Sequence, residues 1–121
     1  MSSRARGLGI RIGRGTPGEL NAITDVPGVR VGQQTVIRGA DGDPDAVRTG
    51  VTAIFPHAGA PWEEPVYVGT HILNGYGELI GINQLREWGI LMSPVVLTSS
   101  MAIGKAYDAT AKWIASITSL V

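Results

Sequence analysis

Glycine and proline interrupt this chain so often that only short helices and strands fit between them. The sequence holds 17 Gly and 7 Pro in 121 residues. Glycine and proline are densest at the start of the chain, where residues 1–20 contain five of the glycines and Pro17. Such a density opposes a helix. We therefore expect residues 1–20 to form an irregular, glycine-rich lead-in.

Apolar residues between the breakers predict several strands. We expect extended segments at about 29–38, 51–55 and 66–68, where valine, isoleucine and aromatic residues gather. The apolar run 90–97 contains Pro94, which cannot donate to a ladder, so this run is either an edge strand or is broken there. Between the first two strands, residues 39–45 (GADGDPD) predict a polar, solvated turn.

Two segments show helical periodicity. Apolar side chains at steps of three predict a helix from Glu78 to Trp88, with Gly89 as its C-terminal stop. A second apolar stripe predicts a helix over about 100–119, for which Thr98, Ser99 and Ser100 offer N-caps. Both apolar stripes need to be covered by other parts of a fold. The order of strands and helices predicts a mixed α/β layer.

Composition excludes several classes of function. Ten Lys+Arg balance ten Asp+Glu, and a net charge of zero argues against a nucleic-acid partner. The absence of Cys excludes disulfides, thiolate zinc sites and a cysteine nucleophile, and it fits a reducing compartment, so we expect a cytoplasmic location. No run of about 18 apolar residues is present, so we expect no membrane span.

No complete catalytic constellation is visible among the residues. His57 and His71 lack the spacing of metal ligands, although His57 with Glu63 and Glu64 could make a loop site. The more economical interpretation of each histidine is structural. The Gly-x-Ser-x-Gly pattern of hydrolases is absent, so we predict no catalytic and no metal-binding residue in this chain.

The turn Gly75-Tyr76-Gly77-Glu78 is the weak candidate for a substrate-binding site. Bare glycine N–H groups at a helix start can approach an anion, but Glu78 in the first helical turn would repel one. Glu78 could instead meet a substrate's ammonium group. The competing structural interpretation is a tight entry to a buried helix that packs closely through Gly81.

Several segments together resemble the DmpA-type aminopeptidases. This family is also described as L-aminopeptidase/D-amidase/D-esterases of the P1 peptidase family, with β-aminopeptidases as relatives. The resemblance covers about residues 8–114, which would be the N-terminal part of the α subunit and about a third of a family member. The segments, in order, are 21–32 (NAITDVPGVRVG), 48–54 (RTGVTAI), 74–81 (NGYGELIG) and 94–98 (PVVLT).

The resemblance implies a fold and an activity. The fold is a four-layer α/β/β/α sandwich with a mixed sheet, related in layout to ornithine acetyltransferase. Family members cut themselves into an α and a β subunit, and the new N-terminal Ser of β attacks peptides, amides or esters that carry a free amino end. Homotetramers or similar assemblies are usual, and no metal or organic cofactor is needed.

The same resemblance places every catalytic residue beyond residue 121. We therefore expect residues 1–121 to be a single segment, the N-terminal third of a larger self-processing hydrolase domain, and to be inactive alone. Its partners would be the remainder of α and the β subunit. Gln33 stands where many relatives have His, so no particular substrate is implied. The alternative is a truncated, non-catalytic paralogue that acts as an oligomeric scaffold or interaction module.

Overall fold

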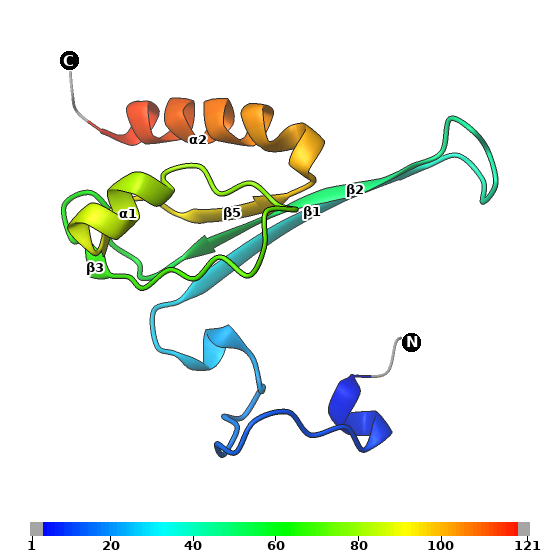
Figure 1. Cartoon of the computed structure of the whole chain (residues 1–121), viewed down its shortest axis with the longest axis horizontal. Coiled ribbons are helices and arrows are strands. Elements are labelled where there is room, and N and C mark those ends of the chain that lie inside the picture. Colours follow the sequence, from blue (N-terminus) through cyan, green and yellow to red (C-terminus); the bar gives the residue numbers. More distant parts are fainter. Residues whose placement is uncertain (1–3, 119–121) are drawn as a thin grey trace.

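An antiparallel sheet organises the computed structural model, which describes residues 4–118 (Figure 1). Its strands are β1 (Arg30–Arg38), β2 (Val47–Phe55) and β5 (Val95–Thr98), in the spatial order β1-β2-β5. Both pairings are antiparallel. The strands expected at 29–38 and 51–55 are confirmed, and β2 begins earlier than expected because it stays paired with β1 as far as Val47↔Arg38.

The register gives the sheet two distinct faces. Side chains alternate along a strand, so residues that pair across strands share a face. Arg30 pairs with Phe55, and Ala53 pairs with Val96, on one face. Val31 pairs with Ile54, and Ile54 pairs with Val95, on the other.

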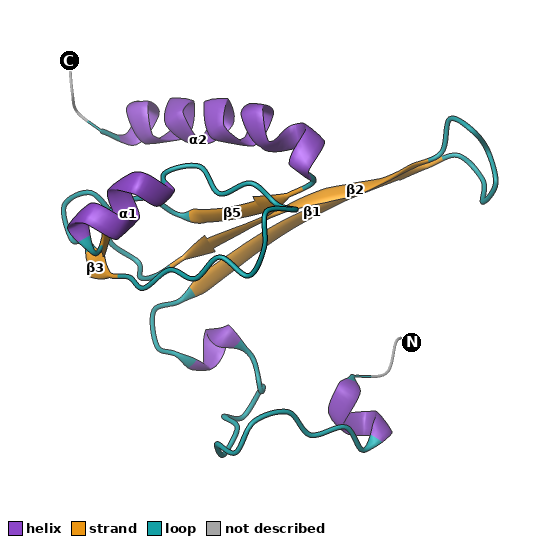
Figure 2. Cartoon of the chain, viewed as in Figure 1, coloured by secondary structure: helices purple, strands orange, loops and turns teal. Residues whose placement is uncertain are grey.

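Helix α2 (Ile103–Ile117) covers the Phe55 face. The rings of Phe55 and Trp113 meet edge to face with centroids 5.3 Å apart, and Trp62 meets Trp113 in the same way at 6.5 Å. The guanidinium carbon of Arg30 lies 5.4 Å from the centroid of the Phe55 ring on this face. These aromatic contacts hold α2 to the sheet. Figure 2 shows both α-helices on this side and the N-terminal segment on the opposite side.

Pro94 divides the apolar run 90–97 into two strands, as one of the two interpretations predicts. Strand β4 (Ile90–Leu91) pairs with β3 (Val66–Tyr67) in a separate two-stranded sheet, and β5 begins directly after Pro94. The strand expected at 66–68 is thus confirmed in shorter form. Pro94 itself is buried.

Helix α1 (Ile82–Trp88) is shorter than the sequence predicts. Its N-cap, Gly81, has a φ of +86°, which a residue other than glycine rarely adopts and which prevents helical hydrogen bonding from continuing back to Glu78. The expected start at Glu78 is therefore wrong. The expected stop is confirmed, because Gly89 is left-handed and donates its N–H to the Leu85 carbonyl.

The expected serine caps of α2 are absent. Ser99 precedes a 3₁₀ turn, η3 (Ser100–Ala102), and makes no side-chain cap hydrogen bond. The N-cap of α2 is Ala102, which has no capping side chain. Thr98 turns away from the helix, because its hydroxyl donates to the Gly50 carbonyl on β2 at 3.0 Å. The helix expected over about 100–119 is confirmed as η3 followed by α2, and residue 119 lies outside the described residues.

The N-terminal segment is held by short-range contacts. It contains two 3₁₀ turns, η1 (Ala5–Leu8) and η2 (Ile23–Asp25), and is otherwise irregular up to β1. The Asp25 carboxylate accepts hydrogen bonds from the backbone N–H groups of Ala22 and Leu20. These two bonds hold the pKa of the Asp25 carboxyl below its ordinary value. The chain turns at Pro27-Gly28 before β1, with Gly28 at φ +88°.

The described residues contain no buried apolar side chain apart from proline. Within residues 4–118 only Pro61 and Pro94 are buried, and residues such as Ile37, Leu73 and Tyr107 are exposed. The chain exposes 9902 Å². A folded protein of 12.7 kDa exposes about 6,200 Å², so this chain carries roughly 3,700 Å² of additional surface. Surface on that scale is typical of the interior faces of a larger fold.

Candidate functional site

The turn at residues 74–78 is exposed and is held by one local hydrogen bond. The Asn74 side-chain oxygen accepts from the Tyr76 backbone N–H at 3.0 Å. A Cβ atom added to Gly75 or Gly77 would meet no atom within 4 Å. Within residues 4–118, Glu78 forms no salt bridge. The turn therefore presents an exposed carboxylate that has no cationic partner in the part of the chain described here.

The late start of α1 changes the chemistry of this turn. Because the helix begins at Ile82, Glu78 is not in its first turn, and Gly75 and Gly77 do not lie at its N-terminus. The interpretation of these glycines as anion-binding donors beside a helix dipole loses its basis. The competing interpretation, a helix that packs closely through Gly81, also fails at one point. A Cβ atom added to Gly81 would meet no atom within 4 Å, so the left-handed φ of this residue rather than close packing requires glycine.

Glu78 borders an apolar groove between α1 and α2. The groove has a volume of about 730 Å³, and the segment 90–96 lines it together with residues of both helices. Glu78 is the one charged residue among those that line it within the described residues. The aromatic members of the lining are Trp62, Trp88 and Tyr107. A carboxylate beside an apolar groove is an arrangement that suits a ligand with both a cationic and an apolar part.

This groove was not predicted from the sequence. The available signal was the pair of apolar helix stripes, both of which were expected to need cover. The sequence could not show that the stripes face each other across a gap, because that depends on the break at Pro94 and on the late start of α1.

His57 has a structural role. Its Nδ1 accepts the backbone N–H of Gly59 at 3.1 Å, so Nε2 carries the hydrogen that is donated to the Glu64 carbonyl at 2.7 Å. The imidazole ring closes the loop at 57–64, and its Nδ1 lies 3.9 Å from the Glu64 carboxylate. Glu63 does not join this network. Residues 4–118 hold no group of three or more metal-ligating side chains, and this includes the neighbourhood of His71.

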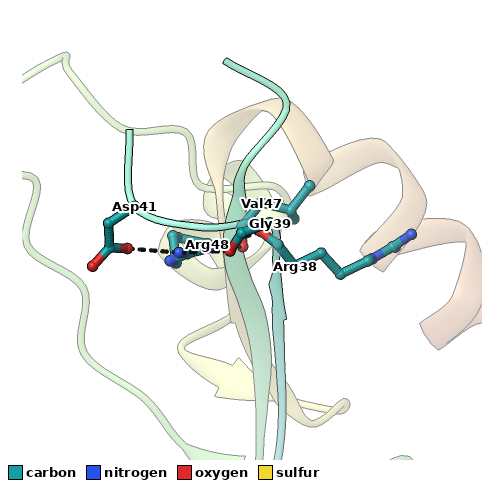
Figure 3. Close-up of polar contacts among 5 residues, drawn as sticks. All are labelled: Arg38, Gly39, Asp41, Val47 and Arg48. Carbon is teal, nitrogen blue, oxygen red and sulfur yellow. Dashed lines mark hydrogen bonds and ion pairs between the residues drawn. The ribbon is translucent and has the colours of Figure 1, made fainter. Parts of the chain in front are cut away.

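The acidic loop between β1 and β2 is closed by Arg48 (Figure 3). Its Nη1 donates to the carbonyls of Arg38 at 2.7 Å and Val47 at 2.9 Å. Its Nη2 donates to the Gly39 carbonyl at 3.1 Å and the Asp41 carboxylate at 2.7 Å. The loop is a solvated turn, as predicted, and its acidic side chains make hydrogen bonds within the turn itself.

Helices of the described region are too short and too polar to cross a bilayer: none of them reaches the length and hydropathy of a membrane span.

Solved structures of longer proteins share this fold. A β-aminopeptidase from a Burkholderia species matches 97% of the chain with a TM-score of 0.84 and 46% identity. The L-aminopeptidase D-Ala-esterase/amidase of Ochrobactrum anthropi matches 93% with a TM-score of 0.77 and 42% identity. The latter is described as a prototype of the serine aminopeptidases and a variant of the Ntn-hydrolase fold. The expected α/β class, that of the DmpA-type sandwich, is thereby confirmed.

The sequence comparison gives the family within that class. Residues 21–119 match Peptidase family S58, and the chain belongs to this family. The β-peptidyl aminopeptidase BapA of Sphingosinicella microcystinivorans is 40% identical over 117 residues. The resemblance to the DmpA-type aminopeptidases is therefore confirmed.

The chain spans about a third of the length of these relatives. The matched region is 29% of BapA, 33% of the Burkholderia protein and 31% of the Ochrobactrum protein. This proportion fits the expectation of a segment of a larger hydrolase.

Proposed function

We propose that the full-length protein containing this chain is a self-processing serine aminopeptidase/amidase. It would release N-terminal residues from peptides, amides and esters through an N-terminal Ser nucleophile located beyond residue 121. Membership of Peptidase family S58 over residues 21–119 carries this proposal. Residues 1–121 would then be the N-terminal third of the hydrolase domain and belong to its α subunit.

The chemistry of the described residues supports a non-catalytic role for this segment. Nucleophilic catalysis by serine requires a base within hydrogen-bond reach. In residues 4–118 the hydrogen bonds of His57 go to Gly59 and Glu64, and Ser99 and Ser100 make no bond to a base. The segment would supply sheet and helix surfaces against which the catalytic part folds. We also propose a cytoplasmic location, a homo-oligomeric assembly and activity without a metal or cofactor.

Glu78 is our proposed contact for the substrate's free amino group. Its carboxylate is exposed, lacks a cationic partner among the described residues and follows an exposed Gly-flanked turn. A charge-assisted hydrogen bond to an ammonium group is worth more than a neutral one. Gly75 and Gly77 would let the turn approach the substrate closely, because they present no side chains.

Two experiments on the full-length protein test the activity. Intact mass should show two pieces, the second beginning with Ser, and amino-acid p-nitroanilides should be hydrolysed. The 121-residue chain alone should give one uncut mass and no turnover. A single uncut mass in an active full-length protein would contradict self-processing, and turnover by the short chain would place the nucleophile within it.

The role of Glu78 is tested by Glu78→Gln with Glu87→Gln as the control. Glu87 lies on α1 but does not line the groove. Removing a charged contact typically costs about 1.5–3 kcal/mol, so kcat/KM for a free amino substrate should fall roughly 10- to 100-fold, mainly through KM. An equal loss with both variants would remove Glu78 from the proposed site.

A truncated, non-catalytic paralogue is the second candidate function. The many exposed apolar side chains, such as Ile37, Leu73 and Tyr107, favour it, because exposed apolar faces drive association. Such a chain would form a defined oligomer and bind no aminopeptidase substrate. A monodisperse monomer that binds no apolar dye would contradict this scaffold role.

A further inference from the structure

Asn74 and Gly75 form the one Asn-Gly pair of the sequence, at the start of the exposed turn 74–78. Asparagine is a thermolabile residue. It loses its side-chain amide most readily when glycine follows it, because no Cβ atom then shields the next backbone nitrogen. Sequence therefore marks Asn74 as reactive, and the structure decides whether the fold protects it.

Gly75 has the freedom that this reaction requires. The turn lies outside the helices and strands, and within residues 4–118 its backbone groups make no hydrogen bond to another backbone group. The Gly75 N–H therefore has no backbone acceptor in this region, and its nitrogen can lose a proton to water. A Cβ atom added at Gly75 would meet no atom within 4 Å, so no neighbouring group crowds the nitrogen.

A hydrogen bond holds the Asn74 side chain close to that nitrogen and activates it. Asn74 Oδ1 accepts the Tyr76 backbone N–H at 3.0 Å, which closes an Asx turn whose ring of atoms includes the Gly75 nitrogen. The side-chain carbon Cγ is thereby kept near the group that attacks it. Negative charge develops on Oδ1 during the attack, and the same N–H donor stabilises that charge.

We propose that Asn74 is a site of spontaneous deamidation, with water as the only co-reactant. The Gly75 nitrogen forms a bond to Asn74 Cγ and gives its proton to solvent, while the side-chain nitrogen takes up a proton and leaves as ammonia. Water then opens the cyclic succinimide. Cleavage of the new N–Cγ bond gives aspartate. Cleavage of the original peptide bond gives isoaspartate, in which the main chain runs through Cβ and Cγ.

Both products add a negative charge to the turn that carries Glu78. Aspartate keeps a side-chain acceptor for the Tyr76 N–H. Isoaspartate lengthens the main chain by one carbon and moves the carboxylate away from its place in the Asx turn, so this turn is lost. The proposal concerns the chemistry of the turn and does not depend on the proposed hydrolysis.

The two other asparagines of the sequence are internal controls, because both are exposed as well. Asn21 is followed by Ala22, whose N–H donates to the Asp25 carboxylate at 3.0 Å. Asn83 lies in α1, where helical hydrogen bonds prevent the backbone rotation that ring closure needs. Neither asparagine precedes an unengaged glycine nitrogen.

Peptide mapping of the full-length protein tests the proposal. The protein is kept in warm, mildly alkaline buffer and digested in acid, and each asparagine peptide is followed by its mass and by methylation with an isoaspartyl methyltransferase. Asn74 should convert at least about tenfold faster than Asn21 or Asn83. It should convert no more slowly than in a synthetic peptide of residues 70–80, because the Asx turn favours ring closure.

Gly75→Ala and Gly77→Ala are the matched variants. Both glycines lack a positive φ and have room for a Cβ atom, so both variants should fold. Gly75→Ala should slow conversion of Asn74 about tenfold, because its methyl group shields the attacking nitrogen, whereas Gly77→Ala should leave the rate unchanged. Equal rates in the two variants, equal rates at the three wild-type asparagines, or slower conversion in the protein than in the peptide would each overturn the proposal.

Discussion

Gly81, the N-cap of α1, and Gly104, inside α2, differ in whether their backbone conformation requires glycine. A Cβ atom at either position would meet nothing within 4 Å. Gly81 has a φ of +86°, whereas Gly104 lies inside α2 without a positive φ. Backbone conformation therefore decides whether replacing each glycine by alanine raises or lowers the free energy of unfolding.

We predict opposite effects for these two glycines. Gly81→Ala should destabilise by about 1–2 kcal/mol, because alanine is strained in the left-handed region. Gly104→Ala should stabilise by about 0.4–1 kcal/mol, because it lowers the entropy of the unfolded chain. Denaturant unfolding of the full-length protein measures both. Two changes of the same sign would show that φ does not control the effect.

Asp25 predicts a pH dependence of the N-terminal turn. Hydrogen bonds from Ala22 and Leu20 lower its pKa in the folded chain. Its stabilising effect is therefore fully present above the unfolded pKa, about 3.9. The effect is lost as the pH falls further through the lower folded pKa. Asp25→Asn should remove this dependence while keeping the shape of the side chain.

Amide hydrogen exchange at Leu20 and Ala22 is the readout for Asp25. Exchange should accelerate in acid beyond its intrinsic pH dependence in the wild-type chain, and the excess should be absent in the Asn variant. The same excess in both proteins would assign the effect to another group.

At the scale of elements, the β1–β2 hairpin reaches well beyond the helices and depends on Arg48 at its tip (Figure 1). Arg48→Lys should loosen the tip, because a lysine ammonium cannot reproduce the four donor contacts of the guanidinium. Amides at 40–46 should exchange faster, while those at 51–55 should not. Asp41→Asn should have a smaller effect, since an exposed ion pair is worth only about 0–1 kcal/mol and the three carbonyl contacts remain.

Trp113 connects α2 to both the sheet and the loop at 57–64. Its ring contacts Phe55 on β2 and Trp62 in that loop. Each aromatic pair contributes about 0.5–1.5 kcal/mol, so Trp113→Ala should cost about 1–3 kcal/mol and weaken the near-ultraviolet circular dichroism signal. Trp113→Phe should recover part of the loss. A neutral Trp113→Ala variant would mean that other contacts hold α2 in place.

Much of this element structure is predictable from local sequence. The strands β1 and β2 follow from local runs of valine, isoleucine and aromatic residues, and the break at Pro94 and the stop at Gly89 each follow from one residue whose chemistry acts within a few positions. The start of α1 does not, because apolar residues at 79, 82, 85 and 88 continue the helical period through a glycine whose left-handed φ interrupts it. The expected caps fail because the 3₁₀ turn η3 separates Ser99 from α2 and because Thr98 bonds instead to Gly50, a residue far away in sequence.

At the scale of the whole molecule, the described chain has sheet faces and helix stripes but no apolar interior of its own. The site therefore could not be predicted beyond the turn at Gly75–Glu78. The residues that we propose complete it lie outside these 121 residues, and the groove becomes visible only once α1 and α2 are placed.

The missing interior predicts poor cooperativity for the isolated chain. Residues 1–121 alone should bind an apolar dye and unfold with an m-value well below that of a compact domain of similar length, since m follows the surface exposed on unfolding. Full-length protein should show a steep transition and little dye binding. A steep transition of the short chain without dye binding would show that it forms its own core.

The strand order also determines when, during synthesis, each strand can pair with its neighbour. The β1–β2 hairpin is complete once Phe55 has emerged from the ribosome, but Thr98, the partner of Val51, comes 43 residues after Phe55. At about 5–20 residues per second, the second edge of β2 waits roughly 2–9 s for β5. During that interval a nascent chain offers an open apolar strand to its neighbours, so the speed of translation between these two strands bears directly on the yield of folded protein.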